Sequence, residues 1–336
     1  PILTIMGTPD DVLPLAATYL RIYFLGIPFF LIFNFGAAIL RSMGDTKRPL
    51  YILVIAGIIN TLLNLFFVIA LKMSVAGVAV ATGIANMVSA LLIIRLLCKE
   101  KAPFKLHLNK IGVAWSELRR MLIIGIPAGL QGMVFSFSNV LLQTAINGYG
   151  SDAIAGSAAA LNFEYYCYFV ISAFNGAAIS FIGQNYGAGN KERVRRIYWI
   201  CLTLSVVCCG ALNELFVWQR HFFLSFFSND PNVQTYGATR MGIVLAWQFI
   251  ASSYEISASS LRGMGRSMLP TILTVFGTCL LRIVWVYVVC PIWHTYDVIM
   301  LVYPVSWCIT GIMVCTAFYL FARKKLYIEA ATGHKL

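Results

Sequence analysis

The chain has 336 residues, of which 60% are hydrophobic and only 11% are charged, and its mean hydropathy is +0.80. A soluble domain of this length cannot bury so much apolar surface, so the composition excludes an ordinary soluble protein and indicates a membrane protein. The formal net charge of +12 would suit nucleic acid, but the basic residues lie in short gaps between apolar runs, as in membrane proteins, and no nucleic-acid partner is expected.

The apolar residues fall into runs long enough to cross a bilayer. A transmembrane helix needs about 20 predominantly apolar residues, and Gly, Pro and charged clusters mark the ends of the runs. The sequence therefore predicts an all-α, multi-pass membrane protein with about nine spans. The predicted spans are residues 12–40, 50–71, 76–97, 119–147, 153–182, 196–218, 234–261, 270–291 and 297–322.

Lysine and arginine alternate between the two sides of the predicted membrane. They gather in every second gap and are scarce in the gaps between, and basic loops face the cytoplasm. Residues 98–118 are therefore predicted to form a cytoplasmic linker, and residues 323–336 a cytoplasmic tail that ends the chain inside the cell. The basic segments are residues 41–49, 98–120, 183–196, 262–269 and 323–336.

Two segments, Leu40–Pro49 and Leu261–Pro270, repeat one pattern. They share Leu, Arg, Met, Gly and Pro at the same offsets. The recurring residues include Arg41, Gly44 and Pro49 in the first copy and Arg262, Gly265 and Pro270 in the second. Such repeats are typical of secondary transporters that are built from two related helical bundles.

The repeat predicts how the chain divides. Residues 1–97 are expected to be the second half of an N-terminal bundle, with three helices, and residues 119–322 a C-terminal bundle of six helices. Three spans precede the second copy within its bundle and none precedes the first. We therefore expect a fragment whose complete form has three more helices ahead of residue 1, or about twelve in all.

Ionisable residues inside a membrane are rare, and most of them serve a function. Glu164 lies within the fifth predicted span, shares a helix face with Tyr168 four residues later, and is followed on the same span by Asn175. A carboxylate in a low-dielectric pocket can exchange H⁺, Na⁺ or an organic cation, and aromatic rings suit organic cations. The alternative is a structural glutamate that bonds to neighbouring helices.

Glu255 lies in the seventh predicted span, beside several serines. It is interpreted either as a second cation site or gate, or as the partner of Arg282 or Arg262 in a salt bridge. Arg282 is expected to be a structural counter-ion, because a buried guanidinium needs an acidic partner. Arg240 is expected to extend its charge to the outer membrane surface.

Gln131 and Asn139 place polarity on the fourth predicted span. They either line a cavity or form hydrogen bonds between helices, and the two interpretations remain open. The nine cysteines and four histidines show no metal-ligand spacing, and no catalytic cluster is visible. The sequence therefore predicts a protein that is not an enzyme and has no catalytic residues, metal or cofactor.

Four motifs together resemble the multidrug and toxic compound extrusion (MATE) transporters, in particular the bacterial branch of the DNA-damage-inducible F protein. The motifs are Leu40–Pro49, Gly183-Gln184-Asn185-Tyr186-Gly187-Ala188-Gly189, Gly125–Gln131 and Ala158–Glu164. The resemblance implies two six-helix bundles, of which this chain is similar to helices four to twelve. It also implies export of cationic and amphipathic compounds in exchange for Na⁺ or H⁺.

The chain departs from the family pattern at its acidic residues. In many relatives a key carboxylate lies on the first helix, which would precede this chain. Some relatives carry an acid on helix seven, where the stretch from Gln131 to Asn139 has none. Glu164 and Glu255 are therefore the candidate carboxylates of the second bundle.

The expected function is an ion-coupled antiporter of the bacterial inner membrane, coupled to H⁺ or Na⁺, that exports small organic cations as a monomer surrounded by membrane lipid. One alternative is a flippase for lipid-linked saccharides, which several buried arginines converging on a cavity would favour. A membrane-embedded enzyme would need a catalytic cluster. A non-transporting membrane scaffold would tolerate the loss of both intramembrane glutamates.

Overall fold

The computed structural model describes residues 13–101 and 103–322, and every regular element in them is helical. Eight of the helices are long and apolar enough to cross a membrane, which confirms an all-α, multi-pass architecture. The predicted tail at 323–336 and the first residue of the first predicted span lie outside the described residues. The chain divides into two compact units that meet in sequence at Val113 and Ala114, inside the predicted linker.

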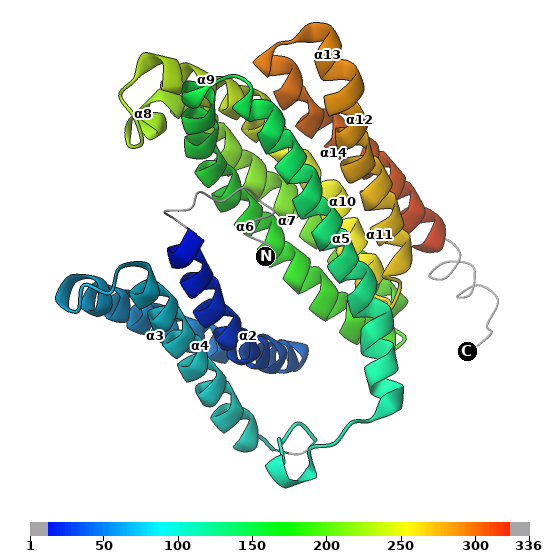
Figure 1. The fold of residues 1–336 in the computed structure, drawn as a ribbon. Helices are drawn as coiled ribbons and strands as arrows, with labels where there is room; N and C mark the ends of the chain where they lie inside the picture. Colours follow the sequence, from blue (N-terminus) through cyan, green and yellow to red (C-terminus); the bar gives the residue numbers. More distant parts are fainter. Residues whose placement is uncertain (1–12, 102, 323–336) are drawn as a thin grey trace. The chain divides into compact units, whose positions relative to one another are not determined.

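The first unit contains three membrane-length helices (Figure 1). They are α2 (Leu13–Ser42), α3 (Lys47–Leu65), which continues through the π-helical turn η1 (Phe66–Ala70), and α4 (Ser74–Cys98). A 3₁₀ turn, η2 (Leu108–Lys110), follows. Helices α2 and α3 both pack on α4, around a small core of Phe33, Ala37, Leu40, Ile52, Ile93 and Leu97.

The second unit begins with three long helices and ends with a fourth. The long helices are α5 (Trp115–Asn147), α6 (Ser151–Gly187), α7 (Lys191–Trp218) and α14 (Tyr296–Ala322). Between α7 and α14 lie α8 (Arg220–Ser225), α9 (Pro231–Ile243), η3 (Leu245–Ile250) and α10 (Ala251–Gly263). They are followed by α11 (Met268–Thr274), η4 (Val275–Leu280), α12 (Leu281–Val284), η5 (Trp285–Val289) and α13 (Cys290–Trp293), which run on as a single membrane-length helix, Met268–Trp293.

The seventh predicted span, 234–261, is a broken helix. The 3₁₀ turn η3 separates α9 from α10, so this segment is not one of the eight long apolar helices. Helix α10 instead packs against α6, α7 and α14, and four of its serines, Ser252, Ser257, Ser259 and Ser260, are buried. Small side chains let helix backbones approach closely and hydrogen-bond across the contact, which explains a polar helix at the centre of an apolar bundle.

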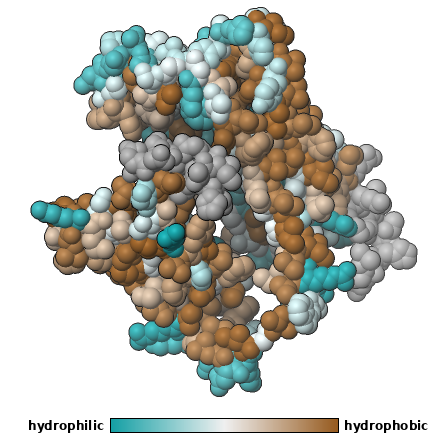
Figure 2. All heavy atoms as spheres, in the orientation of Figure 1, coloured by the Kyte–Doolittle hydropathy of each residue, from teal (hydrophilic) through white to brown (hydrophobic). Residues whose placement is uncertain are grey.

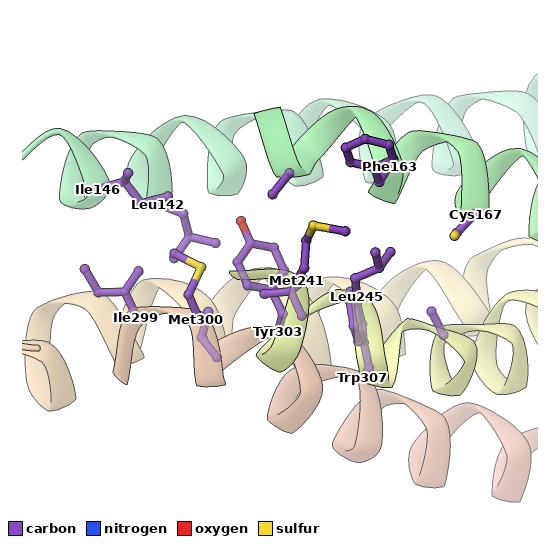
Figure 3. Packing of buried hydrophobic residues seen from close by; sticks show 14 of the residues in the cluster. Leu142, Ile146, Phe163, Cys167, Met241, Leu245, Ile299, Met300, Tyr303 and Trp307 are labelled. Atoms are coloured by element: carbon purple, nitrogen blue, oxygen red, sulfur yellow. The ribbon is translucent and has the colours of Figure 1, made fainter. Parts of the chain in front are cut away.

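The core of the second unit joins α5, α6, α9, η3 and α14 (Figure 3). Large apolar side chains from these elements interdigitate in its centre. They include Leu142, Ile146, Phe163, Met241, Leu245, Ile299, Met300 and Trp307. Many more large apolar side chains are exposed on the outer faces of the helices, and Figure 2 shows hydrophobic residues over much of the visible surface. Such a surface matches a lipid environment.

The internal repeat forms the same turn twice. Gly44 and Gly265 both have a positive φ, at 86° and 77°. In the first copy the backbone N–H of Asp45 donates to Leu40 O at 3.0 Å, and in the second Arg266 N–H donates to Leu261 O at 2.8 Å. This is the Schellman pattern, in which a glycine ends a helix in the left-handed region.

The two copies differ in the side-chain contacts that surround the turn. In the first unit Arg48 forms ion pairs with Asp45 and with Glu100, which follows α4. Partial burial alone would raise the pKa of Asp45, but the hydrogen bonds and positive charge of Arg48 outweigh it and hold the pKa below its usual value. In the second unit the residue equivalent to Asp45 is Arg266, whose guanidinium lies 5.7 Å from the centre of the Phe321 ring.

Helices α6 and α9 cross with their backbones in close contact at Gly156 and Gly237. A Cβ added to Gly156 would lie 2.8 Å from the backbone nitrogen of Gly237, a distance that real Cβ atoms do not show. Neither backbone can move away without disturbing the core around it. The crossing therefore depends on glycine, and it fixes the separation of the two helices that carry Glu164 and Arg240.

We expect Gly156→Ala to destabilise the protein, because the methyl group forces α6 and α9 apart. The expected loss is about 1–3 kcal/mol, as for other overpacked sites, and thermal unfolding in detergent would measure it. Gly176→Ala is the matched control, because a Cβ at this position of the same helix meets nothing within 4 Å. Equal melting temperatures for the two variants would contradict the assignment.

Candidate functional site

Glu164 and Arg240 form a buried, two-pronged ion pair between α6 and α9. Arg240 Nε lies 2.5 Å from Glu164 Oε1, and Arg240 Nη2 lies 3.0 Å from Oε2. Gln248 donates from Nε2 to the backbone oxygen of Glu164 at 2.9 Å. The expectation that Arg240 extends to the membrane surface is wrong, since its side chain is only 3% exposed. Because α6 and α9 cross closely, the carboxylate of Glu164 lies within reach of Arg240. The hydrogen bonds of the ion pair replace those that water would make to the guanidinium at the membrane surface.

The ion pair bears on the two interpretations of Glu164, as a cation-exchange site or as a structural glutamate. Both carboxylate oxygens accept hydrogen bonds from one guanidinium, so an incoming cation would have to displace Arg240. The geometry favours the structural interpretation, in which Glu164 ties α6 to α9.

Arg282 is buried on α12 without an acidic partner. It donates from Nη1 to Asn139 Oδ1 at 2.9 Å, and from Nε to Ser306 Oγ at a longer 3.4 Å. Its guanidinium lies 5.1 Å from the ring centre of Phe135 and 4.6 Å from that of Tyr303. Among the described residues no carboxylate lies within ion-pair distance, so the prediction that Arg282 is a counter-ion is wrong. Ring faces and neutral oxygens surround the charge instead.

Tyr303 lies between the two buried arginines. Arg240 is 5.4 Å from its ring centre, and Arg282 is 4.6 Å away. Figure 3 places Tyr303 in the middle of the core, among residues from α6, α9 and α14. The ring thus links the Glu164–Arg240 pair to Arg282 through two cation–π contacts. The sequence carried no signal for this role, because Tyr303 is one aromatic residue among many in an apolar span.

Glu255 on α10 is half-buried and has no cationic partner. Asn175 donates from Nδ2 to Glu255 Oε2 at 2.9 Å, and no ion pair to Glu255 is present in the described part of the chain. The predicted alternative of a salt bridge to Arg282 or Arg262 is therefore wrong. Tyr168, which was predicted to share a helix face with Glu164, is 40% exposed, whereas Glu164 is buried.

Arg262 is held by Gln131 instead. It donates from Nη2 to Gln131 Oε1 at 2.6 Å, across from α10 to α5. Asn139, eight residues further along α5, accepts a hydrogen bond from Arg282 in the same way. Both predicted polar residues of α5 thus form hydrogen bonds between helices. Gln131, Phe135 and Asn139 are spaced four apart, so one stripe of α5 meets two arginines.

The first unit has its own groove, mainly apolar, with a cavity of about 570 Å³. Its lining combines aromatic and amide side chains with Arg41 of the repeat. The polar members are Asn34, Arg41, Thr46, Asn60, Thr82, Asn86 and Ser89. Asn60 also accepts a hydrogen bond from Asn64 at 3.1 Å. Across residues 13–101 and 103–322, no three His, Cys, Asp or Glu side chains are grouped as a metal site would require.

Long apolar helices that enclose ionisable and amide side chains define a class, the multi-pass membrane transporters. The MatE family model matches residues 1–66 and 127–288, about two thirds of the chain, so the chain belongs to the MATE family of multidrug efflux transporters. Members of this family are transporters and not enzymes.

Known proteins agree with this assignment. The chain is 34% identical over 195 residues to the probable multidrug resistance protein YpnP of Bacillus subtilis, and 26% identical over 285 residues to the probable multidrug resistance protein YoeA of the same organism. These alignments cover 57% and 82% of the chain, but only 43% and 61% of the relatives' lengths. A solved structure of the outward-facing conformation of a multidrug resistance MATE family transporter shares the fold, with a TM-score of 0.86 and 20% identity, and the match covers 99% of this chain and 73% of that one.

We expect Glu164→Gln to destabilise the protein by about 3–5 kcal/mol, because it leaves the buried charge of Arg240 without a counter-charge. The double variant Glu164→Leu with Arg240→Met should recover much of the lost stability, since apolar replacement of a buried pair is often neutral. Thermal unfolding in detergent tests both. A Glu164→Gln protein as stable as the unmodified one would rule out the structural role.

Proposed function

We propose that the protein is a cation-coupled antiporter of the bacterial inner membrane, which exports cationic or amphipathic organic compounds in exchange for H⁺ or Na⁺. Glu255 is its coupling carboxylate in the second unit. The observation that supports this choice is that Glu255 forms no ion pair within residues 13–101 and 103–322, whereas Glu164 is neutralised by Arg240.

The surroundings of Glu255 suit reversible cation binding. Asn175 holds one carboxylate oxygen in place with a single hydrogen bond at 2.9 Å, and the other oxygen has no hydrogen-bond partner among the described residues. A carboxylate in a low-dielectric site gains from binding a proton, Na⁺ or an organic cation. Tyr168 supplies an aromatic ring, 40% exposed, that can contact an organic cation.

The transport cycle follows from competition at this site. When Glu255 is ionised, it attracts an organic cation from one side of the membrane. When H⁺ or Na⁺ binds from the other side, the carboxylate loses its net charge and its attraction for the cargo, which leaves. Ligands that bind the inward- and outward-facing states unequally shift the population between them, which produces alternating access.

The names of the relatives support drug export as the activity, and the chain matches part of their length, so the activity of the whole protein is a proposal. Flipping of lipid-linked saccharides is the second candidate. The observation in its favour is the buried and acid-free Arg282, which suits a phosphate group. Several arginines converging on one cavity would be needed, and the other fully buried arginine, Arg240, is neutralised by Glu164.

We expect Glu255→Gln to abolish resistance to cationic drugs in cells that lack their own exporters, because the amide binds no proton and carries no charge. Glu214→Gln is the matched control, since Glu214 is exposed near the end of α7 and should tolerate the change. Membrane levels of both variants are measured by immunoblot. Full resistance with Glu255→Gln at equal levels would reject Glu255 as the coupling site.

The coupling ion is identified in liposomes by imposing Na⁺ and pH gradients separately. Drug efflux driven by one gradient and lost in Glu255→Gln is the expected result. Transport of a lipid-linked saccharide without either gradient, abolished by Arg282→Gln, would support the flippase instead.

A further inference from the structure

Arg262 and Glu255 lie on one face of the same helix. They are seven residues apart on α10, which is two turns, or about 10 Å along the axis. Side chains on a helix lean toward its N-terminus, so the long Arg262 side chain extends in the direction of Glu255. In the described residues the two side chains form no ion pair: Glu255 accepts from Asn175, and Arg262 donates to Gln131.

The present hydrogen bonding of Arg262 is incomplete. Its Nη2 donates to the neutral amide oxygen of Gln131 at 2.6 Å, while its Nε is buried and has no partner. A buried donor without an acceptor is unfavourable, because it has lost its hydrogen bonds to water and gained none in the protein. An ionised carboxylate is a stronger acceptor for a guanidinium than an amide is. Arg262 thus has a reason to leave Gln131 whenever a carboxylate becomes available.

We propose that Arg262 is a tethered cation that alternates between two partners, Gln131 on α5 and Glu255 on α10. When Glu255 is neutralised by a bound H⁺ or Na⁺, Arg262 rests on Gln131, as in this structure. When Glu255 is ionised and its site is empty, Arg262 moves to the carboxylate and releases Gln131. The transport meaning of this exchange depends on the proposed function, but the exchange itself does not.

The side chains that the neighbouring helices place near Glu255 supply no positive charge that could replace Arg262. Helix α6 contacts Glu255 through the amide of Asn175, and the titratable side chain that α6 carries nearest to Asn175 in sequence, Tyr168, is not a cation. From α7, Tyr198 is engaged with Ser257 at 3.0 Å, and from α14, Cys315 is engaged with the backbone oxygen of Ser253 at 3.4 Å. Helix α11 carries no titratable side chain. Among these groups Arg262 alone can neutralise an ionised Glu255.

Release of Gln131 would act on α5, the helix with few buried contacts. Only Pro127, Ser138, Leu142 and Ile146 of its 33 residues are buried. The hydrogen bond from Arg262 is one of two arginine contacts that hold its polar stripe, and the other is from Arg282 to Asn139. In the same half of α5, Ser267 Oγ donates to the backbone oxygen of Ile124 at 2.8 Å. Loss of the Arg262 contact therefore weakens the attachment of this half of α5 without removing it, and the charge of Glu255 modulates that attachment.

The test measures the ionisation of Glu255 directly, in the purified protein in liposomes. The infrared carboxyl band that disappears in Glu255→Gln is titrated with pH, with and without Na⁺. Arg262→Gln removes the stabilising cation, so the midpoint should rise by about one pH unit or more. Gln131→Met removes the competing partner and leaves Arg262 free for Glu255, so the midpoint should fall.

The opposite signs distinguish an exchange from a purely structural bond. If Arg262 only held α5 in place, both variants would break the same hydrogen bond and shift the midpoint in the same direction or not at all, which would overturn the proposal. Gln143→Met is the matched control, because Gln143 bonds only to Asn147 on α5 itself. If Arg262→Gln does not fold, the direction of the Gln131→Met shift decides: a fall supports the exchange, and a rise or no change overturns it.

The outcome is separable from that of the proposed function. Opposite midpoint shifts with unchanged drug export in Glu255→Gln would keep the exchange and reject Glu255 as the coupling site. Loss of export in Glu255→Gln without midpoint shifts in the Arg262 and Gln131 variants would keep the coupling site and reject the exchange.

Discussion

A charge buried among lipid-facing helices must find its partner inside the protein, and this constraint organises the second unit. Arg240 forms an ion pair with Glu164, and Arg262 donates a hydrogen bond to Gln131. Arg282 donates a hydrogen bond to Asn139 and contacts two aromatic rings. Each contact joins two helices that apolar packing alone would leave free to slide, because lipid tails solvate leucine as well as another helix does. The positions of α5, α6, α9 and α12 therefore follow from where the arginines are satisfied.

The same constraint explains why Glu255 differs from Glu164. Helices α6 and α9 meet at Gly156 and Gly237, which brings Arg240 to Glu164 with two good hydrogen bonds. Glu255 instead accepts one hydrogen bond from the amide of Asn175, and Arg262 on the same helix donates to Gln131. A carboxylate with strong, fixed partners stabilises structure, whereas one with weak partners can change its charge.

The sequence was sufficient for the membrane class, the helix positions and the repeat, because these depend on local patterns of apolar runs and glycine. It predicted the helical path through 234–261 but not its break at η3, which depends on packing against α7 and α14. It identified Glu164, Glu255, Arg282 and Asn139 as intramembrane polar residues, because a polar residue inside a long apolar run can be recognised from the sequence alone. It could not assign partners: Glu164 with Arg240 and Arg262 with Gln131 are contacts across 76 and 131 residues of chain.

The Schellman turns at Gly44 and Gly265 give identical backbones to two places of opposite charge. Asp45 lies after the first glycine and Arg266 after the second. The turn itself is formed by main-chain groups, so it leaves the adjoining side chain free to diverge after a duplication. The same turn therefore carries a carboxylate paired with Arg48 in one copy and a guanidinium facing the Phe321 ring in the other, so an ion pair supports the first corner and an aromatic ring supports the second.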